Sequence, residues 1–211
     1  MLGDSCYYKG LVRYRQASSP NPVLIIIIVN VVVYIATRIE PGLVYELGLY
    51  AGSNFLNHPW GIFTSLFVHR GLWHILANML TFFFFGSTLS NIVGSRRMLI
   101  IYFLGGLIGG AFFVLLAPSS YMAVGASGAV FALGSALAVL RPKLPVVIFP
   151  IPAPMPLWVA TIIIFLILTF LPGVAWQAHL GGFLSGVAWQ AHLGGFLSGA
   201  AMGYLVLKRK F

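Results

Sequence analysis

The sequence predicts an all-α polytopic membrane protein built as a bundle of six transmembrane helices. Three observations support this fold class: 60% of the 211 residues are hydrophobic, only 7% are charged, and the apolar residues fall into long runs. Soluble domains carry about a quarter of charged residues, and so few charged side chains do not cover a surface in water. The composition therefore excludes a soluble enzyme.

The predicted spans follow from the length of each apolar run. A helix needs about 20 apolar residues to cross the hydrocarbon core, and shorter runs are tolerated where the bundle buries them or the bilayer thins. We predict spans at residues 23–39, 72–89, 98–117, about 121–140, and 157–171, with the first as an uncleaved anchor. The sixth span lies within residues 174–207, a stretch that is too long for one crossing.

Lysine and arginine gather in loops on one side of the predicted membrane. With the N-terminus in the cytoplasm, Arg38 and Arg70 lie outside, whereas the inside loops hold Lys9, Arg13, Arg15, Arg96, Arg97, Arg141, Lys143, Lys208, Arg209 and Lys210. Basic residues favour cytoplasmic loops. We therefore expect a multi-pass protein with both termini cytoplasmic, in the plasma membrane of a prokaryote.

The predicted organisation is one membrane domain with two short ends. Residues 1–22 form a cytoplasmic tail, residues 23–207 the six-helix domain, and residues 208–211 a basic cytoplasmic C-terminus. The external loop at residues 40–71 contains several glycines and a tryptophan. A loop of this length is more than a linker, and we expect it to lie partly on or in the membrane.

An exact tandem repeat occupies residues 173–198. Residues 173–185 read GVAWQAHLGGFLS, and residues 186–198 repeat that string without a change. The repeat creates two candidate histidines, His179 and His192. On a regular helix, thirteen steps of about 100° turn the second copy some 220° from the first, so both histidines cannot face one partner.

Two features favour the second copy of the repeat. His192 is followed by Gly195, Gly199 and Gly203, which allow close packing on a neighbouring helix, and then by the basic residue Lys208 at the interface. The first copy would instead place polar residues deeper in the bilayer. We prefer His192, keep His179 as the alternative, and expect the first copy to enlarge the fifth loop.

Polar residues inside apolar spans are functional candidates because they are costly in lipid. His74 and Asn78 are an i, i+4 pair on one face of the second span, and Ser127 lies in Gly125-Ala-Ser-Gly128 at the start of the fourth. Each pattern alone also fits a purely structural role, as an interhelical hydrogen-bond clamp or as close packing of small residues.

The charge-based orientation places His74, Asn78, Ser127 and His192 at the external ends of their helices. A histidine on a neighbouring helix can activate a serine. The backbone N–H of the serine, together with the His74 and Asn78 side chains, is able to stabilise an oxyanion. Asp4 lies in the tail and both glutamates precede the second span, so the sequence predicts a Ser–His dyad without a third acid.

The composition also removes competing chemistries. No glutamate follows Glu46, so a His-Glu-x-x-His zinc site is absent, and one aspartate does not make an aspartyl dyad. The single cysteine, Cys6, leaves no thiol pair. Basic residues at the ends of apolar runs indicate membrane orientation rather than nucleic-acid binding. We expect no metal, no cofactor and no nucleic-acid partner.

Together these motifs resemble the rhomboid family of intramembrane serine proteases. The resemblance covers about residues 60–203 and consists of His-x-x-x-Asn in the second span, Gly-x-Ser-Gly opening the fourth, and Ala-His-x-x-Gly-x-x-x-Gly in the sixth. It implies that Ser127 is the nucleophile, that a histidine of the sixth span is the general base, and that His74 and Asn78 are oxyanion donors. It also implies that Phe131 packs against the catalytic histidine.

The expected function is therefore a serine endopeptidase that cleaves transmembrane helices of membrane-protein substrates near the external face. Its expected partners are these substrates and the lipid bilayer. Substrates should carry helix-weakening residues, because an intact helix keeps its carbonyls in hydrogen bonds. The alternative is a catalytically inactive rhomboid-like protein that binds membrane helices. A small transporter comes third, because the spans lack the paired half-helices of inverted repeats.

Overall fold

The computed structural model describes residues 21–148, 151–170 and 188–208. In chain order they form α1 (Pro22–Ile39), α2 (Leu43–Leu47), β1 (Leu49–Tyr50), the 3-10 helix η1 (Gly52–Asn57), α3 (Gly61–Thr64), the 3-10 helix η2 (Ser65–Phe67), α4 (Leu72–Val93), α5 (Ser95–Leu116), β2 (Met122–Ala123), α6 (Ser127–Leu140), β3 (Pro145–Ile148), β4 (Ile151–Pro156), α7 (Leu157–Phe170) and α9 (Trp189–Leu207).

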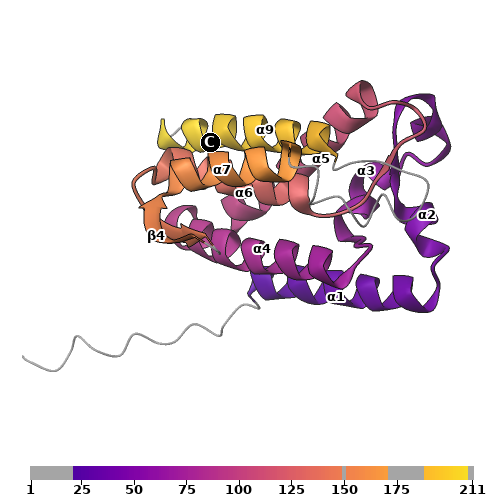
Figure 1. The fold of residues 1–211 in the computed structure, drawn as a ribbon, viewed down its shortest axis with the longest axis horizontal. Helices are drawn as coiled ribbons and strands as arrows, with labels where there is room; N and C mark the ends of the chain where they lie inside the picture. Colours follow the sequence, from indigo (N-terminus) through magenta and orange to yellow (C-terminus); the bar gives the residue numbers. More distant parts are fainter. Residues whose placement is uncertain (1–20, 149–150, 171–187, 209–211) are drawn as a thin grey trace, which may run out of the picture.

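Within the described residues, six helices of at least 14 residues pack side by side: α1, α4, α5, α6, α7 and α9 (Figure 1). The two short antiparallel strand pairs lie at opposite ends of this bundle. The all-α fold class predicted from the sequence is confirmed, and the six long helices are consistent with the predicted number of spans.

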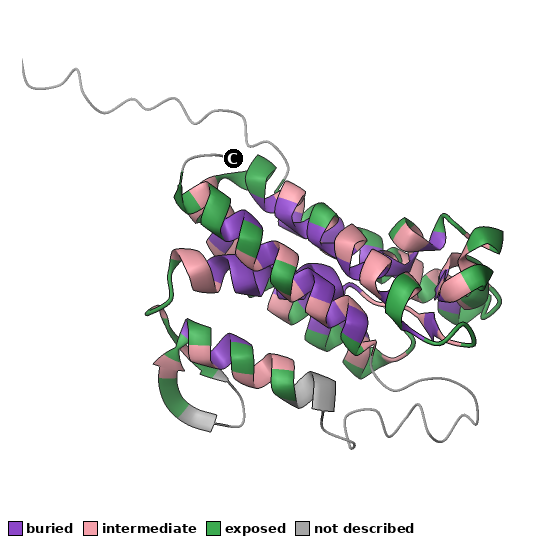
Figure 2. Cartoon of the chain, turned by 90° about the horizontal axis from the view of Figure 1, so that it is seen from above, coloured by how far each residue is buried: buried purple, intermediate pink, exposed green. Residues whose placement is uncertain are grey.

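The helices differ in how well their length matches a bilayer. Of the described helices, α1, α4 and α5 are long and apolar enough to cross a membrane, whereas α6 is a shorter apolar helix. Helix α6 is buried from Gly128 to Leu137 at the centre of the bundle, as Figure 2 shows. A helix surrounded by protein does not need to match the thickness of the hydrocarbon core.

Local sequence explains where the first helices begin and end. The Asn21 side chain accepts a hydrogen bond from the backbone N–H of Val23 at 3.0 Å, and Pro22 occupies the first turn, so both satisfy N-terminal preferences of α1. Gly94, with φ +89°, separates α4 from α5. Its positive φ lets the chain reverse without the steric penalty of a side chain.

The segment between α1 and α4 is folded rather than extended as a simple linker. It contains α2, β1, η1, α3 and η2. Strand β1 pairs antiparallel with β2, with Leu49 opposite Ala123 and Tyr50 opposite Met122. The segment is therefore attached to the chain that leads into α6.

The predicted start of the fourth span is wrong. The run of apolar residues suggested a helix from about residue 121, whereas α6 begins at Ser127. Residues 122–123 are instead strand β2, because a partner strand distant in sequence satisfies their backbone groups. Gly125 follows with φ +122°, a conformation that side chains rarely adopt.

Helix α9 packs closely against α6 through small residues. A methyl group at Gly195 would meet the carbonyl of Gly128, and one at Gly199 would meet the carbonyl of Ala132. At Gly203 a methyl carbon would lie 2.8 Å from Cα of Ala136. The glycine ladder predicted in the sixth span thus lies directly on α6, as small residues do in membrane bundles.

The connection from α6 to α7 is the β3–β4 hairpin. Val146 pairs with Met155, and the backbone N–H of Leu157 donates to the carbonyl of Leu144 at 2.8 Å. Leu144 and Val146 also pack against the buried core. The hairpin is therefore fixed at its base, at the end of the bundle opposite the start of α6 (Figure 1).

Candidate active site

The serine of the Gly-x-Ser-Gly motif is the first residue of the central helix α6. The backbone N–H of Gly125 donates to the carbonyl of Ser65 at 2.9 Å, which holds the chain in place just before the turn into the helix. Ser127 is partly exposed, whereas Gly128 is buried. The first N–H groups of a helix lack intrahelical acceptors, so unpaired donors surround this serine.

Helix α9 brings His192 to Ser127. The imidazole Nε2 lies 2.8 Å from the serine Oγ, and the histidine is only 4% exposed. Gly128 permits this approach, because a methyl carbon there would lie 3.1 Å from the carbonyl oxygen of Ala191. Within the described residues, no hydrogen-bond partner reaches Nδ1 of His192.

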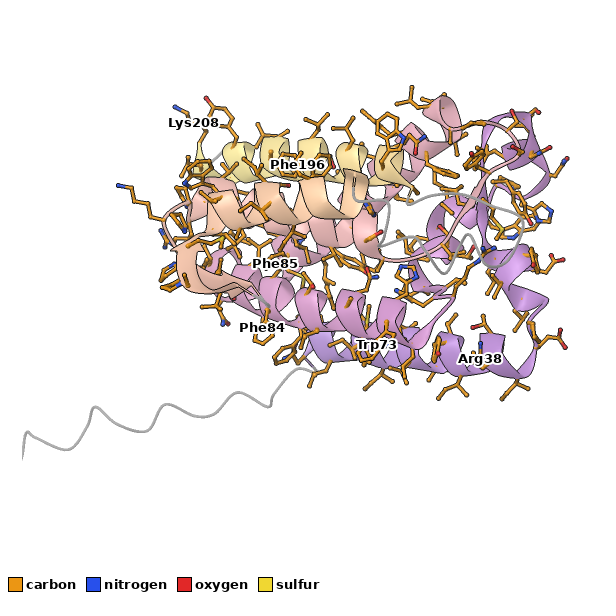
Figure 3. The ribbon with its side chains drawn as sticks, in the orientation of Figure 1. Arg38, Trp73, Phe84, Phe85, Phe196 and Lys208 are labelled. Carbon is orange, nitrogen blue, oxygen red and sulfur yellow. The ribbon has the colours of Figure 1, made fainter. Side chains whose placement is uncertain are left out.

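One aromatic ring packs against the imidazole, and a second ring packs against the first. The ring of Phe131 lies 4.7 Å from that of His192, centroid to centroid, and Phe165 of α7 packs edge-on against Phe131 at 5.7 Å. Phe196, labelled in Figure 3, lies on α9 with its ring 5.2 Å from Phe165. The contact of Phe131 with the histidine is as the resemblance implied. Sequence reasoning missed Phe165, because a phenylalanine in an apolar helix carries no distinguishing signal.

His74 and Asn78 approach the same region from α4. Asn78 is 7% exposed, and its Nδ2 donates to the carbonyl of His74 at 2.9 Å, which leaves its second N–H free of that bond. The His74 ring lies against Gly125, where a methyl carbon would be 2.7 Å from Nε2. The four residues predicted at the external helix ends therefore converge at one end of the bundle.

Ser127 lines two small cavities. The larger, of about 80 Å³, is mostly apolar and lies between α4, α6 and α7, with Asn78, Thr81, Phe85, Ser127, Phe131 and Thr161 among its lining residues. In Figure 3, Phe85 points from α4 toward α7. The second cavity, of about 30 Å³, lies behind the serine between the α1–α4 segment, α5 and α9. Only small groups or water fit there.

A further histidine, His69, lies beside this group and was not among the predicted residues. It is 1% exposed, its ring packs edge-on against that of His74 at 4.9 Å, and among the described residues neither ring nitrogen has a hydrogen-bond partner. Burial, with a smaller effect of His74, lowers the pKa of His69 to about 3. In the sequence His69 follows the apolar residues 66–68 and precedes Arg70, so it looks like the polar end of an apolar run and gives no separate signal.

The environment of α9 explains why the second copy of the repeat carries the histidine in contact with Ser127. His179 and residues 173–185 lie outside the described residues. If the first copy formed this helix instead, with His179 in the place of His192, every position of α9 would hold the residue thirteen places earlier in the chain. A tryptophan would then stand where Met202 is buried, and a glutamine where Gly203 contacts Ala136. No side chain fits at Gly203, so the register with His192 is favoured.

Comparison with known proteins assigns the family. The family model of the Rhomboid domain matches residues 56–190, which is more than half of the chain. The chain belongs to the rhomboid family. The matched residues include Ser127, His74, Asn78 and His179, and they end before His192. In this rhomboid chain, His179 of the first copy therefore lies inside the matched range. His192 of the second copy, which contacts Ser127, lies just beyond it.

Several rhomboid relatives share part of this sequence. It is 35% identical over 89 residues to YdcA of Bacillus subtilis, whose name marks it as a rhomboid protease by inference; the match covers 42% of each chain. It is 38% identical over 125 residues to RHOMBOID-like protein 1 of Arabidopsis thaliana, covering 59% of this chain and 32% of that protein.

Another relative is the mitochondrial Rhomboid protein 1 of Saccharomyces cerevisiae, 30% identical over 131 residues, covering 60% of this chain and 35% of that protein. The matches thus span less than half the length of each of these relatives. They come from a bacterium, a plant and yeast mitochondria, so they do not favour the plasma membrane of a prokaryote over other membranes.

Proposed function

We propose that this rhomboid is an intramembrane serine endopeptidase in which Ser127 is the nucleophile and His192 the general base. The observation that carries the proposal is the 2.8 Å separation of His192 Nε2 and Ser127 Oγ at the end of a buried helix. Nε2 of a neutral imidazole accepts the serine proton when Nδ1 carries the hydrogen. In the part of the chain that the structure describes, Nδ1 of His192 has no hydrogen-bond partner, which agrees with a dyad rather than a triad.

The proposed reaction has two steps. The serine Oγ attacks the carbonyl carbon of the scissile peptide bond while its proton moves to Nε2 of His192, and collapse of the tetrahedral intermediate breaks the C–N bond as the proton passes to the leaving amine. Water then gives a proton to Nε2 and attacks the acyl-serine. The ester C–O bond breaks and the proton returns to Ser127, which frees the acid product and restores the dyad.

We propose that the negative charge on the intermediate is stabilised by three donors: the backbone N–H of Ser127, the free N–H of Asn78 and the imidazole of His74. The backbone N–H is at the start of α6, where it has no intrahelical acceptor and where the helix dipole favours negative charge. Loss of one such donor in other enzymes costs about 10²–10³ in rate. Gly125 leaves room for the His74 ring, and Gly128 leaves room for the backbone of Ala191 beside His192.

The proposed substrate is a transmembrane helix that unwinds near the serine. The apolar cavity between α4, α6 and α7 reaches Ser127 from the side of the bundle and has room for only a few atoms. A regular helix hides its carbonyls and is too wide for this cavity. Substrates with glycine, proline or small residues near the cut are therefore favoured.

Reconstitution with a single-span substrate tests the proposal. Ser127→Ala should abolish cleavage, whereas Ser135→Ala, the matched change of a buried serine on the same helix, should retain it. A fluorophosphonate, which labels activated serines, should modify Ser127 alone in the unaltered chain. Cleavage that persists in the Ser127→Ala protein would refute the proposed nucleophile.

The second candidate function is helix binding without cleavage. A relative from Arabidopsis thaliana, 37% identical over 86 residues, is named Inactive RHOMBOID-like protein 8. A binder would ignore the fluorophosphonate and hold the same substrate helix with or without Ser127→Ala. The 2.8 Å contact between serine and histidine favours the protease, because a binder has no need of that geometry.

The charge distribution supports a proposed topology with both termini cytoplasmic. Among the described residues, exposed basic side chains gather at the end of the bundle away from Ser127: Arg96, Arg97, Arg141, Lys143 and Lys208. Arg38 lies at the other end, far from Lys208 in Figure 3. Basic residues favour the cytoplasmic side, so this distribution supports the proposal that the serine lies toward the external face.

A further inference from the structure

The β3–β4 hairpin exposes an apolar surface at the end of the bundle away from Ser127. Residues 145–156 include no charged or hydroxyl side chain. Val147 is 63% exposed, and Pro145, Ala153, Pro154 and Pro156 are also exposed. An exposed apolar strand pair is a liability in water, because its open edges and side chains promote aggregation. This surface fits an apolar solvent better than an aqueous one.

The backbone of the hairpin is also suited to the edge of a bilayer. Five of its twelve residues are prolines, which have no N–H donor. An unpaired donor is costly in lipid, so each proline on an open edge removes such a cost. The carbonyls at the edges still need partners. Headgroups and water supply such partners, whereas acyl chains do not, so an open strand edge is better suited to the boundary of a bilayer than to its centre.

Basic residues flank the hairpin at its base. Arg141 and Lys143 are both exposed and directly precede β3, and Lys208 is exposed at the same end of the bundle. Among the described residues no carboxylate lies at this end, since Glu40 and Glu46 belong to the opposite end. The charge next to the apolar surface therefore complements anionic phosphate groups of lipids.

The apolar surface continues onto the outer face of α7. Trp158 is 50% exposed, Ile162 40% and Leu166 47%, and these side chains follow the hairpin at helical spacing. Leu157, just before them, is fully buried and tied to Leu144 through its backbone. A tryptophan at this position is typical of the headgroup level of a membrane. The hairpin thus extends the exposed apolar face of α7.

We propose that the β3–β4 hairpin lies in the headgroup and upper acyl region of the bilayer. Val147 and its exposed apolar neighbours contact acyl chains, while Arg141 and Lys143 bind the phosphate groups of anionic lipids. The occupant of this surface is the lipid bilayer, and no second protein is required. This inference does not depend on cleavage by Ser127.

Fluorescence quenching in vesicles tests the depth of the hairpin. The single cysteine is first removed by Cys6→Ser, and an environment-sensitive NBD fluorophore is attached after Val147→Cys, with Leu80→Cys and Ser120→Cys as references. Leu80 is 61% exposed in the middle of α4, and Ser120 is exposed in the α5–β2 loop. The full chain is reconstituted in vesicles of equal parts phosphatidylcholine and phosphatidylglycerol.

We expect a nitroxide near the headgroup to quench the fluorophore at position 147, and iodide in the water to leave it bright. The deep nitroxide should quench position 80, and iodide should quench position 120. A fluorophore at 147 that iodide quenches and lipid nitroxides do not would overturn the proposal. Retained fluorophosphonate labelling or substrate binding shows that the altered chains are folded.

The basic flank is tested in the same system. Changing the vesicles to pure phosphatidylcholine should shift the emission at position 147 to longer wavelength, and Arg141→Gln with Lys143→Gln should remove the difference between the two lipids. Arg96→Gln with Arg97→Gln is the matched control, because it removes the same charge from the same end. Equal effects of both pairs, or no lipid dependence in the unaltered chain, would refute specific headgroup binding by Arg141 and Lys143.

Discussion

His192 and Ser127 lie 65 positions apart in the chain, yet Nε2 of the imidazole is 2.8 Å from the serine Oγ. Two glycine positions make this possible. Gly195 lies against the carbonyl of Gly128, so the backbones of α9 and α6 are in contact there. This is the region where the side chains of His192 and Ser127 meet. The reactive geometry and the close packing of these helices are therefore one structural feature.

This geometry predicts unequal effects of changing the two repeated histidines. His192→Ala should lower cleavage by roughly 10²–10⁴-fold, the usual contribution of a general base, because it removes the only imidazole that contacts Ser127 within the described residues. His179→Ala, an identical change in an identical local sequence, is the control and should leave the rate near that of the unaltered chain. The measurement is initial cleavage rate in proteoliposomes. Loss of activity on His179→Ala alone would show that the first copy works instead.

Removal of one copy of the repeat should preserve activity. Deleting residues 173–185 or residues 186–198 yields the same sequence, which keeps one of the two repeated histidines. It also shortens the link between Phe170 and Trp189 from eighteen residues to five. Five residues are a common length for a helix connection, and the contacts of α9 with α6 are unchanged. We expect cleavage and fluorophosphonate labelling at least equal to those of the full chain. An inactive but folded deletion variant would show that the first copy is needed for the site.

Much of the helical framework could be predicted because it depends on local composition. Apolar runs of sufficient length placed α1, α4, α5 and α7 within a few residues of their observed bounds. The start of α6 could not be placed in this way. Residues 122–123 are apolar enough for a helix, but pairing with β1, more than seventy positions away, determines their conformation.

The candidate site was likewise predictable where local sequence is informative, and not where contacts between distant residues decide. Ser127, His74, Asn78 and His192 stand out in sequence because polar residues are rare in apolar spans. His69 and Phe165 contribute through contacts made only in three dimensions, an edge-on ring pair with His74 and another with Phe131. Such contacts leave no pattern in a single sequence.

The packing of α9 on α6 predicts that Gly199→Ala destabilises the fold. The change gains about 1 kcal/mol of helix propensity, but its methyl group would meet the carbonyl of Ala132 and the Ser135 hydroxyl, and overpacking costs about 1–3 kcal/mol. The net effect should be a lower midpoint of thermal unfolding in detergent. Gly86→Ala is the control, because its nearest neighbours are side-chain atoms of Phe82 at 3.3 Å and Val23 at 3.4 Å and not backbone. Equal midpoints for the two variants would contradict the close contact.

Buried His69 predicts a pH dependence of stability. Burial lowers its pKa to about 3 from the ordinary value of 6.5, so the folded chain keeps it neutral where the unfolded chain takes up a proton. Its contribution is therefore fully present above about pH 6.5 and is lost as the pH falls toward about 3. Between these limits stability should fall by about 1 kcal/mol per pH unit from this group.

The measurement is the slope of unfolding free energy against pH, so a lower absolute stability of the variant does not affect the comparison. His69→Gln should flatten the slope over this window, and His69→Phe, which keeps a ring against His74, should do the same if the glutamine variant does not fold. His58→Gln removes another histidine of the α1–α4 segment and serves as the control. Carboxylates titrate equally in all these chains and cancel in the comparison. An unchanged slope in both His69 variants would mean that the imidazole is solvated in the folded protein, for example by water bound to its two ring nitrogens.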